Sequence, residues 1–392
     1  MPLTTRVPAW LRVAAALFAV GWGANQFAAM LLVYREEDGA SSEAVTALFG
    51  AYALGLIPAL LIVAPISDRI GRRRVMRPVL VLSFVATVIL LVGGDNLAVL
   101  LLGRLVAGIA SGAAFAPGSA WVKELSSDGP PGTGARRATL ALSAGFGSGP
   151  LVAGVFGEWL PDPTVLPYVP HLVLMLGVIA IAWHAPDPYV PGVKDEPRRR
   201  SEVWQAMRSR PFLLGVTLTA PWVFGAAATS FATVPTFVDI GVAPVAVTGA
   251  LTGLTLWTGV VVQPLGKRLH DPRLIIGSGL AAAAAGLLTG LLLAASGAAW
   301  LVLPAAILLG AAYGLILVGG LTTVESLAHP DDLGTLNAVF YSLTYIGFAA
   351  PLLSTLALNV ISPEQLMLVG VLMIALTAPL VLLSRRRVSV RV

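Results

Sequence analysis

The feature that most constrains this chain is the regular return of apolar runs long enough to cross a membrane. A transmembrane helix needs about 20 predominantly apolar residues to cover roughly 30 Å of hydrocarbon. Such runs recur along the whole sequence, and we place twelve of them at 10–33, 45–66, 76–94, 97–121, 137–159, 166–184, 212–236, 245–265, 273–296, 299–322, 336–358 and 364–384. We therefore expect an all-α, polytopic membrane protein.

Composition agrees with a membrane environment. Only 11% of the residues are charged and 57% are hydrophobic, with a mean hydropathy of +0.85. A soluble domain carries about 25% charged residues, because its surface must meet water. The apolar stretch from Val13 to Val33 follows Arg6 and Arg12 but is too long for the core of a signal peptide, so we interpret it as a retained helix.

Cysteine is absent from the sequence, which excludes disulfides, thiolate metal sites and a cysteine nucleophile. The four histidines, His171, His184, His270 and His329, show no metal-ligand spacing and fall near the expected helix ends. We expect them to be interface residues, and we expect no metal site.

Basic residues predict the direction in which the chain crosses the membrane. If the N-terminus is cytoplasmic, every Lys and Arg except Arg35 and Arg104 falls in or beside an inner segment. Arg35 lies in an outer loop and Arg104 lies within a span. Because cytoplasmic loops are enriched in Lys and Arg, we expect both termini to be cytoplasmic.

The spans divide into two halves. We expect an N-terminal six-helix half at 1–185, a cytoplasmic linker at 186–210 that is rich in proline and arginine, and a C-terminal six-helix half at 211–392. Weak matches at an offset of about 201 residues, such as Gly149-Pro150 against Ala350-Pro351, indicate an internal repeat. Two parallel six-helix pseudo-repeats predict a central cavity and alternating access.

The strongest local motif lies at the inner end of the second span and reads Ala64-Pro-Ile-Ser-Asp68-Arg69-Ile-Gly71-Arg72-Arg73-Arg74. It resembles the Gly-x-x-x-Asp-Arg-x-Gly-Arg-Arg signature of the major facilitator superfamily, with Ala64 in place of the leading glycine. The resemblance extends to bacterial twelve-helix drug/proton antiporters. It implies a conformational latch formed by Asp68, Arg69, Gly71, Arg72 and Arg73, which closes the cytoplasmic side against the start of the eleventh span near Gly334. The second half lacks this motif.

Two further motifs resemble elements of the same family. Arg104-Leu-Val-Ala-Gly108 in the fourth span is similar to the Arg-x-x-x-Gly element, which implies a part for Arg104 in proton or substrate coupling. The alternative is that Arg104 snorkels or caps carbonyls of the first span. In the fifth span a helix-bend motif, associated in the family with export in exchange for protons, is matched by Gly145, Gly149, Pro150 and Gly154. Generic tight helix packing is the alternative.

Family geometry suggests which residues face the cavity. The candidates are large aromatic side chains with a few neutral polar ones, which suits an apolar or amphipathic solute. They are Trp22, Asn25, Gln26, Tyr52, Ser111, Phe115, Trp222, Thr229, Trp257, Asn337, Tyr341 and Tyr345.

No acidic residue falls securely at the centre of a span. Glu124, Glu158, Asp239 and Glu325 lie near span ends and stay candidates for proton binding. Proton coupling is thus implied by resemblance, without an obvious titrating group.

These observations predict a secondary transporter in the cytoplasmic (inner) membrane, with proton-coupled efflux of a small solute as the leading hypothesis. The alternatives are an importer or uniporter of a small metabolite, or a non-transporting membrane sensor. We expect no enzyme activity and no cofactor beyond a proton gradient. The expected partners are the lipid bilayer and the small-molecule substrate, not nucleic acid, and we expect a monomer.

Overall fold

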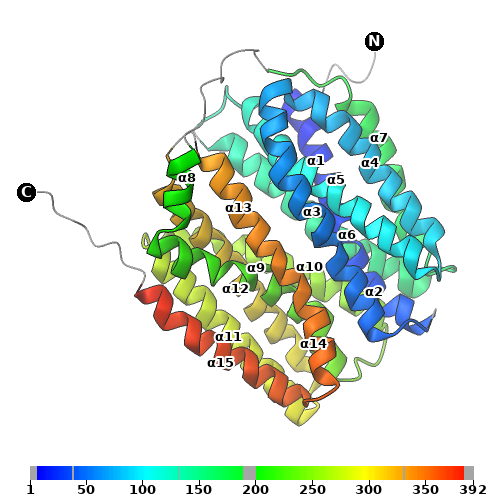
Figure 1. The fold of residues 1–392 in the computed structure, drawn as a ribbon. Coiled ribbons are helices and arrows are strands. Elements are labelled where there is room, and N and C mark those ends of the chain that lie inside the picture. Colours follow the sequence, from blue (N-terminus) through cyan, green and yellow to red (C-terminus); the bar gives the residue numbers. More distant parts are fainter. Residues whose placement is uncertain (1–6, 38, 131, 189–199, 330–331, 384–392) are drawn as a thin grey trace, which may run out of the picture. The chain divides into compact units, whose positions relative to one another are not determined.

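The computed structural model describes residues 7–37, 39–130, 132–188, 200–329 and 332–383. These residues form helices and connecting turns, with no strand among them (Figure 1). Eleven of the described helices are long and apolar enough to cross a membrane, and a twelfth at Leu166–Ala182 is shorter. Arg6, Lys194, Arg198, Arg199, Asp331 and the arginines from residue 385 onwards lie outside the described residues.

Every predicted span corresponds to a helical segment. In the first part of the chain these segments are α1 (Ala9–Asn25) with α2 (Phe27–Glu36), α3 (Ser42–Ile70), α4 (Arg72–Gly93), α5 (Leu97–Glu124), α6 (Thr133–Trp159), and η2 (Leu166–Tyr168) with α7 (Val169–Ala182). The prediction of an all-helical protein with six spans here is confirmed.

The second part begins with a short helix, α8 (Arg200–Met207), in the expected linker. The spans that follow are η3 (Pro211–Thr217) through α9 (Ala220–Ala228), η4 (Thr229–Thr233) and η5 (Val234–Phe237); α10 (Pro244–Lys267); α11 (Pro272–Ser296); η6 (Ala299–Leu301) with α12 (Val302–Leu327); α13 (Leu333–Tyr345) with η7 (Ile346–Ala349) and α14 (Ala350–Leu358); and α15 (Pro363–Leu382).

Local sequence sets the helix ends. Asn96 accepts hydrogen bonds from the backbone of Ala98 and Val99 and so caps α5. Gly297 ends α11 in the left-handed conformation. Ser362 and Gln365 form a reciprocal capping box at the start of α15.

The chain divides into two compact units that do not follow the sequence order completely. The first comprises Met1–Asp195 together with Ile240–Gly253, and the second comprises Glu196–Asp239 and Leu254–Val392. The N-terminal part of α10, from Pro244 to Gly253, therefore belongs to the first unit, and the rest of α10 belongs to the second.

Glycines allow α3 and α5 to approach at backbone distance in the first unit. A methyl group added at Gly108 would lie 2.1 Å from the Tyr52 carbonyl oxygen, and one at Gly112 would lie 2.3 Å from that of Leu56. The second unit repeats this contact between α10 and α12. There Gly310 faces the Thr255 carbonyl oxygen and Gly314 faces that of Gly259.

The glycine contact between α1 and α6 also has a counterpart in the second unit. Gly145 faces the Phe18 carbonyl oxygen, and Gly347 in η7 faces that of Pro221. Each glycine lies about 202 residues from its equivalent, close to the offset that the sequence indicated. The two six-helix pseudo-repeats therefore reuse the same backbone contacts.

Besides the 3₁₀ turns η2 and η6 that open two spans, three spans within the described residues are irregular along their length. The first is interrupted at Gln26, between α1 and α2. The seventh contains two π-helical stretches, η3 and η4, and the eleventh narrows to the 3₁₀ segment η7 before Pro351. Such irregular backbone at membrane depth is tolerated where protein groups serve the freed carbonyls, and it recurs at transport sites.

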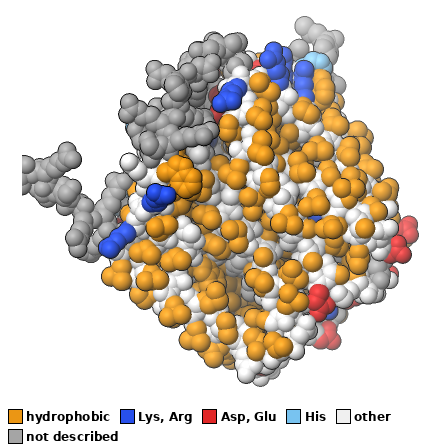
Figure 2. All heavy atoms as spheres, viewed as in Figure 1, with side chains coloured by type: hydrophobic (Ala, Val, Ile, Leu, Met, Phe, Trp, Pro, Cys, Tyr) orange, Lys and Arg blue, Asp and Glu red, His pale blue; other side chains and the backbone are white. Residues whose placement is uncertain are grey.

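Large apolar side chains are exposed along the helices, including Val173, Leu176 and Leu372. Figure 2 shows hydrophobic side chains over most of the visible face, with Lys and Arg at the helix ends. This distribution is that of a surface in contact with lipid tails.

We predict that Gly108→Ala lowers the melting temperature of the purified protein by several degrees, because the new methyl group would overlap the Tyr52 carbonyl oxygen. Scanning fluorimetry in detergent measures the change. Gly177→Ala in α7 is the matched control, since nothing lies within 4 Å of a methyl group there. Equal melting temperatures for the two variants would contradict the prediction.

Candidate functional site

The signature loop forms a sharp break between two helices of the first unit. Gly71 joins α3 to α4 with a φ of 98°, a conformation that other residues rarely adopt. This break lets Arg72 in the first turn of α4 pair with Asp68 in the last turn of α3. Arg72 also donates to Ser67 Oγ at 3.1 Å.

Arg72 connects this loop to a third helix. Its Nη2 and Nε atoms lie 3.0 and 3.2 Å from Glu124 Oε1 at the end of α5. The Arg72 side chain is mostly buried, with 12% of its surface exposed, while Asp68 and Glu124 are each about one third exposed. A half-buried arginine shared by two carboxylates is a charge-assisted network rather than an isolated surface pair.

The segment that follows α7 reaches the same loop. Asp187 Oδ2 accepts a hydrogen bond of 3.0 Å from the backbone N–H of Arg73, and so caps the N-terminus of α4. Arg77 donates twice to the Trp183 carbonyl oxygen, at 2.8 and 2.7 Å. Sequence reasoning missed Asp187, because nothing in the local pattern connects it to a residue more than a hundred positions earlier.

The predicted latch residues Asp68, Gly71, Arg72 and Arg73 are thus brought together within the first unit. Arg69 lies beside them in the last turn of α3. The predicted closure against Gly334, in the second unit, stays a prediction.

Arg104 lies at the centre of a second polar cluster and is fully buried. Its guanidinium donates to the carbonyl oxygens of Leu48 (3.2 Å), Phe49 (3.1 Å) and Ala24 (3.4 Å). The first two belong to α3, and Ala24 directly precedes the break in the first span. The ion pairs among the described residues include none with Arg104.

Aromatic rings complete the surroundings of Arg104. Its guanidinium carbon lies 4.6 Å from the ring centroids of both Phe27 and Tyr52, at cation–π distance. One cavity candidate, Tyr52, is therefore part of the Arg104 cluster, and another, Ser111, is buried on α5. Arg104 therefore caps a carbonyl group of the first span, which is one of the two alternatives given for it above, and also caps carbonyl groups of α3.

The helix-bend motif packs against two different helices. Gly145 and Gly149 face the backbone of α1 at Phe18 and Trp22. On its other side, Gly154 and the Pro150 carbonyl oxygen face Gly249 in the part of α10 that belongs to the first unit. The motif is therefore a two-sided close contact, and Gly249 is a partner that the sequence analysis did not find.

Other candidates of the first unit differ in their surroundings. Asn25 and Gln26 are buried at the break in the first span, and Gln26 Nε2 donates to Thr87 Oγ1 at 3.2 Å. The Trp22 Nε1 and Gln26 Oε1 atoms are buried without a hydrogen-bond partner. Phe115 packs edge-on against Phe146 at 5.5 Å between ring centroids.

The second-unit candidates fall into three groups. Tyr345 stacks on Phe224 at 4.5 Å between ring centroids, within an aromatic cluster that includes Phe348. Asn337 Oδ1 is buried without a partner. The remaining candidates are the half-buried Trp222, Thr229 and Tyr341 and the exposed Trp257.

The candidate acids have distinct positions. Glu124 belongs to the Arg72 network described above. Glu158 Oε2 accepts from the backbone N–H groups of Val245 (2.8 Å) and Ala246 (3.2 Å), and so caps α10 from α6. Asp239 and Glu325 are exposed.

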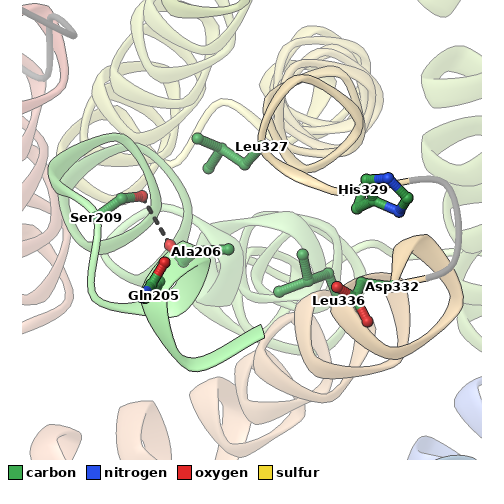
Figure 3. A pocket seen from close by; sticks show the side chains of 7 residues that line it. All are labelled: Gln205, Ala206, Ser209, Leu327, His329, Asp332 and Leu336. Atoms are coloured by element: carbon green, nitrogen blue, oxygen red, sulfur yellow. Dashed lines mark hydrogen bonds between the residues drawn. The ribbon is translucent and has the colours of Figure 1, made fainter. Parts of the chain in front are cut away.

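A cavity of about 280 Å³ lies at one end of the second unit, among α8, the end of α12 and the start of α13 (Figure 3). Its polar lining residues are Gln205, Ser209, His329 and Asp332. Asp332 occupies the N-cap position of α13, but its side chain makes no capping hydrogen bond.

Comparison with known proteins identifies the fold. A family model described as Major Facilitator Superfamily matches residues 13–351. No curated protein sequence matches the chain. Two crystal structures of the nucleoside transporter NupG, one of them a point mutant, are similar in fold. The mutant has a TM-score of 0.73 at 11% identity and the other 0.70 at 10%, and each comparison covers 96% of this chain and 99% of the other.

We predict that Arg72→Gln reduces transport about tenfold, since it removes the shared partner of Asp68 and Glu124, a loss of about 1.4 kcal/mol. Arg74→Gln is the matched control, because Arg74 is an exposed residue of the same helical turn. Solute flux in vesicles with equal amounts of protein measures both. An equal loss in the control would show that only net charge matters at this loop.

We further predict that Arg104→Lys loses transport at least about tenfold although the charge is kept. A single ammonium group cannot serve carbonyls that the planar guanidinium reaches on two helices. Each lost hydrogen bond from the charged guanidinium costs about 1.5–3 kcal/mol. The control is Arg35→Lys, at an exposed position, and wild-type flux in Arg104→Lys would refute this role.

Proposed function

Because the chain belongs to the Major Facilitator Superfamily, we propose that this transporter moves a small apolar or amphipathic solute by alternating access, coupled to protons and in the direction of efflux. The family match over nearly the whole chain carries the assignment as a transporter. The finer statements on solute, coupling and direction rest on the following observations.

The proposed class of solute follows from buried polar atoms on neutral side chains. Trp22 Nε1 and Gln26 Oε1 in the first unit, and Thr233 Oγ1 and Asn337 Oδ1 in the second, are buried without a hydrogen-bond partner. A buried polar group without a partner costs free energy, so such atoms are suited to bind a ligand. Uncharged donors and acceptors favour a neutral or weakly polar solute over a strongly charged one.

The direction of transport is proposed from the helix-bend motif. Gly145, Gly149, Pro150 and Gly154 are matched to the family element associated with proton-driven export. Their close contacts with α1 and α10 support a mechanical role for this helix. Proton coupling is proposed together with efflux.

We propose that both termini are cytoplasmic and that the protein resides in the inner membrane as a monomer. In the first unit, contacts of Arg72, Arg77 and Arg137 join the ends of several helices on one side. Arg137 also lies over the Trp10 ring at 3.7 Å, near the start of α1. A basic end of this kind supports a cytoplasmic location under the positive-inside rule.

A second candidate function is uptake or facilitated diffusion of a small polar metabolite such as a nucleoside. The likeness in fold to a nucleoside transporter favours it. The same unpartnered donors and acceptors would suit a nucleobase or a sugar hydroxyl.

We predict substrate-dependent proton movement in liposomes that contain the purified protein and an internal pH dye. The panel consists of tetraphenylphosphonium, chloramphenicol and uridine, and Arg72→Gln protein is the low-activity control. Proton movement with the neutral chloramphenicol supports the proposed antiport, whereas proton movement with the cationic tetraphenylphosphonium alone would contradict the proposed class of solute. Uridine equilibration without proton movement would overturn it in favour of a uniporter, and uridine accumulation in energised cells would indicate import.

A further inference from the structure

A continuous chain of buried polar groups joins three helices of the first unit. His171 Nε2 lies 3.0 Å from the Ala19 carbonyl oxygen of α1, and His171 Nδ1 lies 2.8 Å from Thr87 Oγ1 of α4. Thr87 Oγ1 in turn accepts from Gln26 Nε2 at 3.2 Å. His171, Thr87 and Gln26 are all fully buried or nearly so. Contrary to the expectation of an interface residue, His171 is an interior residue of α7.

The direction of each hydrogen bond follows from the groups that form it. A carbonyl oxygen only accepts, so His171 Nε2 carries a proton and donates to Ala19. In the neutral ring Nδ1 then accepts from the Thr87 hydroxyl, and the Thr87 oxygen is free to accept from the Gln26 amide. Gln26 Oε1, at the far end of the chain, is buried without a partner.

The sequence makes room for the His171 ring. A methyl group on Gly23 would lie 2.6 Å from His171 Nε2 and 2.7 Å from its Cε1 atom. Only glycine at position 23 therefore lets an imidazole lie against α1 at this level. The ring is held between the first span and α4, three residues before the break at Gln26.

No carboxylate lies on the helices packed against α7. These elements are α1, α4 and η2. Their charged residues are Arg12 and the arginines in the first turns of α4, which lie roughly 10–23 Å along the helices from Ala19 and Thr87 at about 1.5 Å per residue. Tyr168 of η2 is the other titratable group, and its hydroxyl hydrogen-bonds Tyr34 at 2.8 Å.

Protonation of the His171 ring would reverse the direction of the hydrogen bonds that join His171, Thr87 and Gln26. A proton added to Nδ1 turns this nitrogen from acceptor to donor, so it must donate to Thr87 Oγ1. The Thr87 hydroxyl then needs a new acceptor, and Gln26 Oε1 supplies one when the side-chain amide turns over. The amide NH₂ would then point to where the carbonyl oxygen pointed before.

We propose that His171 is a proton-binding site and that Thr87 and Gln26 transmit its protonation to the break in the first span. The Gln26 amide presents an acceptor when the ring is neutral and a donor when the ring is charged. The part of this inference that concerns coupled transport rests on the proposed function, whereas proton binding itself does not. His171 also supplies a titrating group, which the sequence does not offer as an acidic residue at a span centre.

The first experiment uses protons alone as the ligand. Full-length protein with His184→Asn, His270→Asn and His329→Asn, carrying a tag without histidine, leaves His171 as the sole histidine. Its ring nitrogens and the Gln26 side-chain amide, both labelled with ¹⁵N, are followed by NMR as the pH falls from about 8 through the histidine range and below. The Gln26 signal is assigned by its loss in Gln26→Met.

The expected result is a neutral ring protonated at Nε2 near pH 8, which gains a second proton as the pH falls, with the Gln26 amide shifting at the same midpoint. In Thr87→Val the Gln26 shift should no longer follow the ring, and in Thr87→Ser, which keeps the hydroxyl, it should. A ring that keeps one proton throughout, or a Gln26 signal that ignores the ring, would overturn the proposal.

The second experiment tests coupling in the liposome assay, with whichever panel solute moves protons in the wild type. Thr87→Val and His171→Gln should lose proton movement at least about tenfold, while Thr87→Ser and solute exchange at equal pH persist. Wild-type proton movement in both disrupted variants would refute the role of His171 in coupling. If the wild type moves no protons with any solute, the proposed antiport fails, and the NMR result still decides proton binding.

Discussion

The rest of the first unit depends on one constraint, that a helix interrupted inside a membrane must have its freed carbonyls served by protein groups rather than by water. The first span breaks at Gln26, and two buried cationic or ionisable side chains bond to its carbonyls. Arg104 donates to the carbonyl oxygen of Ala24, next to the break, and His171 donates to that of Ala19, within the continuous part of α1. Both side chains come from other helices, so these two bonds also orient α5 and α7 against α1.

The two pseudo-repeats share a scaffold but not its chemistry. The glycine contacts of Gly108 and Gly145 are repeated at Gly310 and Gly347, because backbone-to-backbone packing needs only a missing side chain. The two buried ionisable groups are not repeated, since the offset places Ala306 opposite Arg104 and Met373 opposite His171. Buried charge is costly in a membrane, so packing alone gives no reason to duplicate it.

The spans, several caps and the family could be predicted from the sequence, because apolar length, turn residues and the Asp68–Arg73 motif are local signals. Partners distant in the chain could not be predicted. Asp187 reaches Arg73, and Gly249 faces Gly154, only once the helices have packed. The sequence predicts an interface position for His171, because this residue lies near the end of an expected helix. A position near a helix end does not show how deeply that end is buried, and His171 is fully buried.

The division of α10 has a consequence for how the protein could be taken apart. Cutting the chain in the segment after α7 would separate residues 1–195 from Gly249, leaving the backbone of Pro150 and Gly154 without the helix that covers it in the first unit. The Glu158 carboxylate would lose the two N–H groups of Val245 and Ala246 as well. The N-terminal six helices therefore lack, by themselves, the part of α10 that packs against α6 in the first unit.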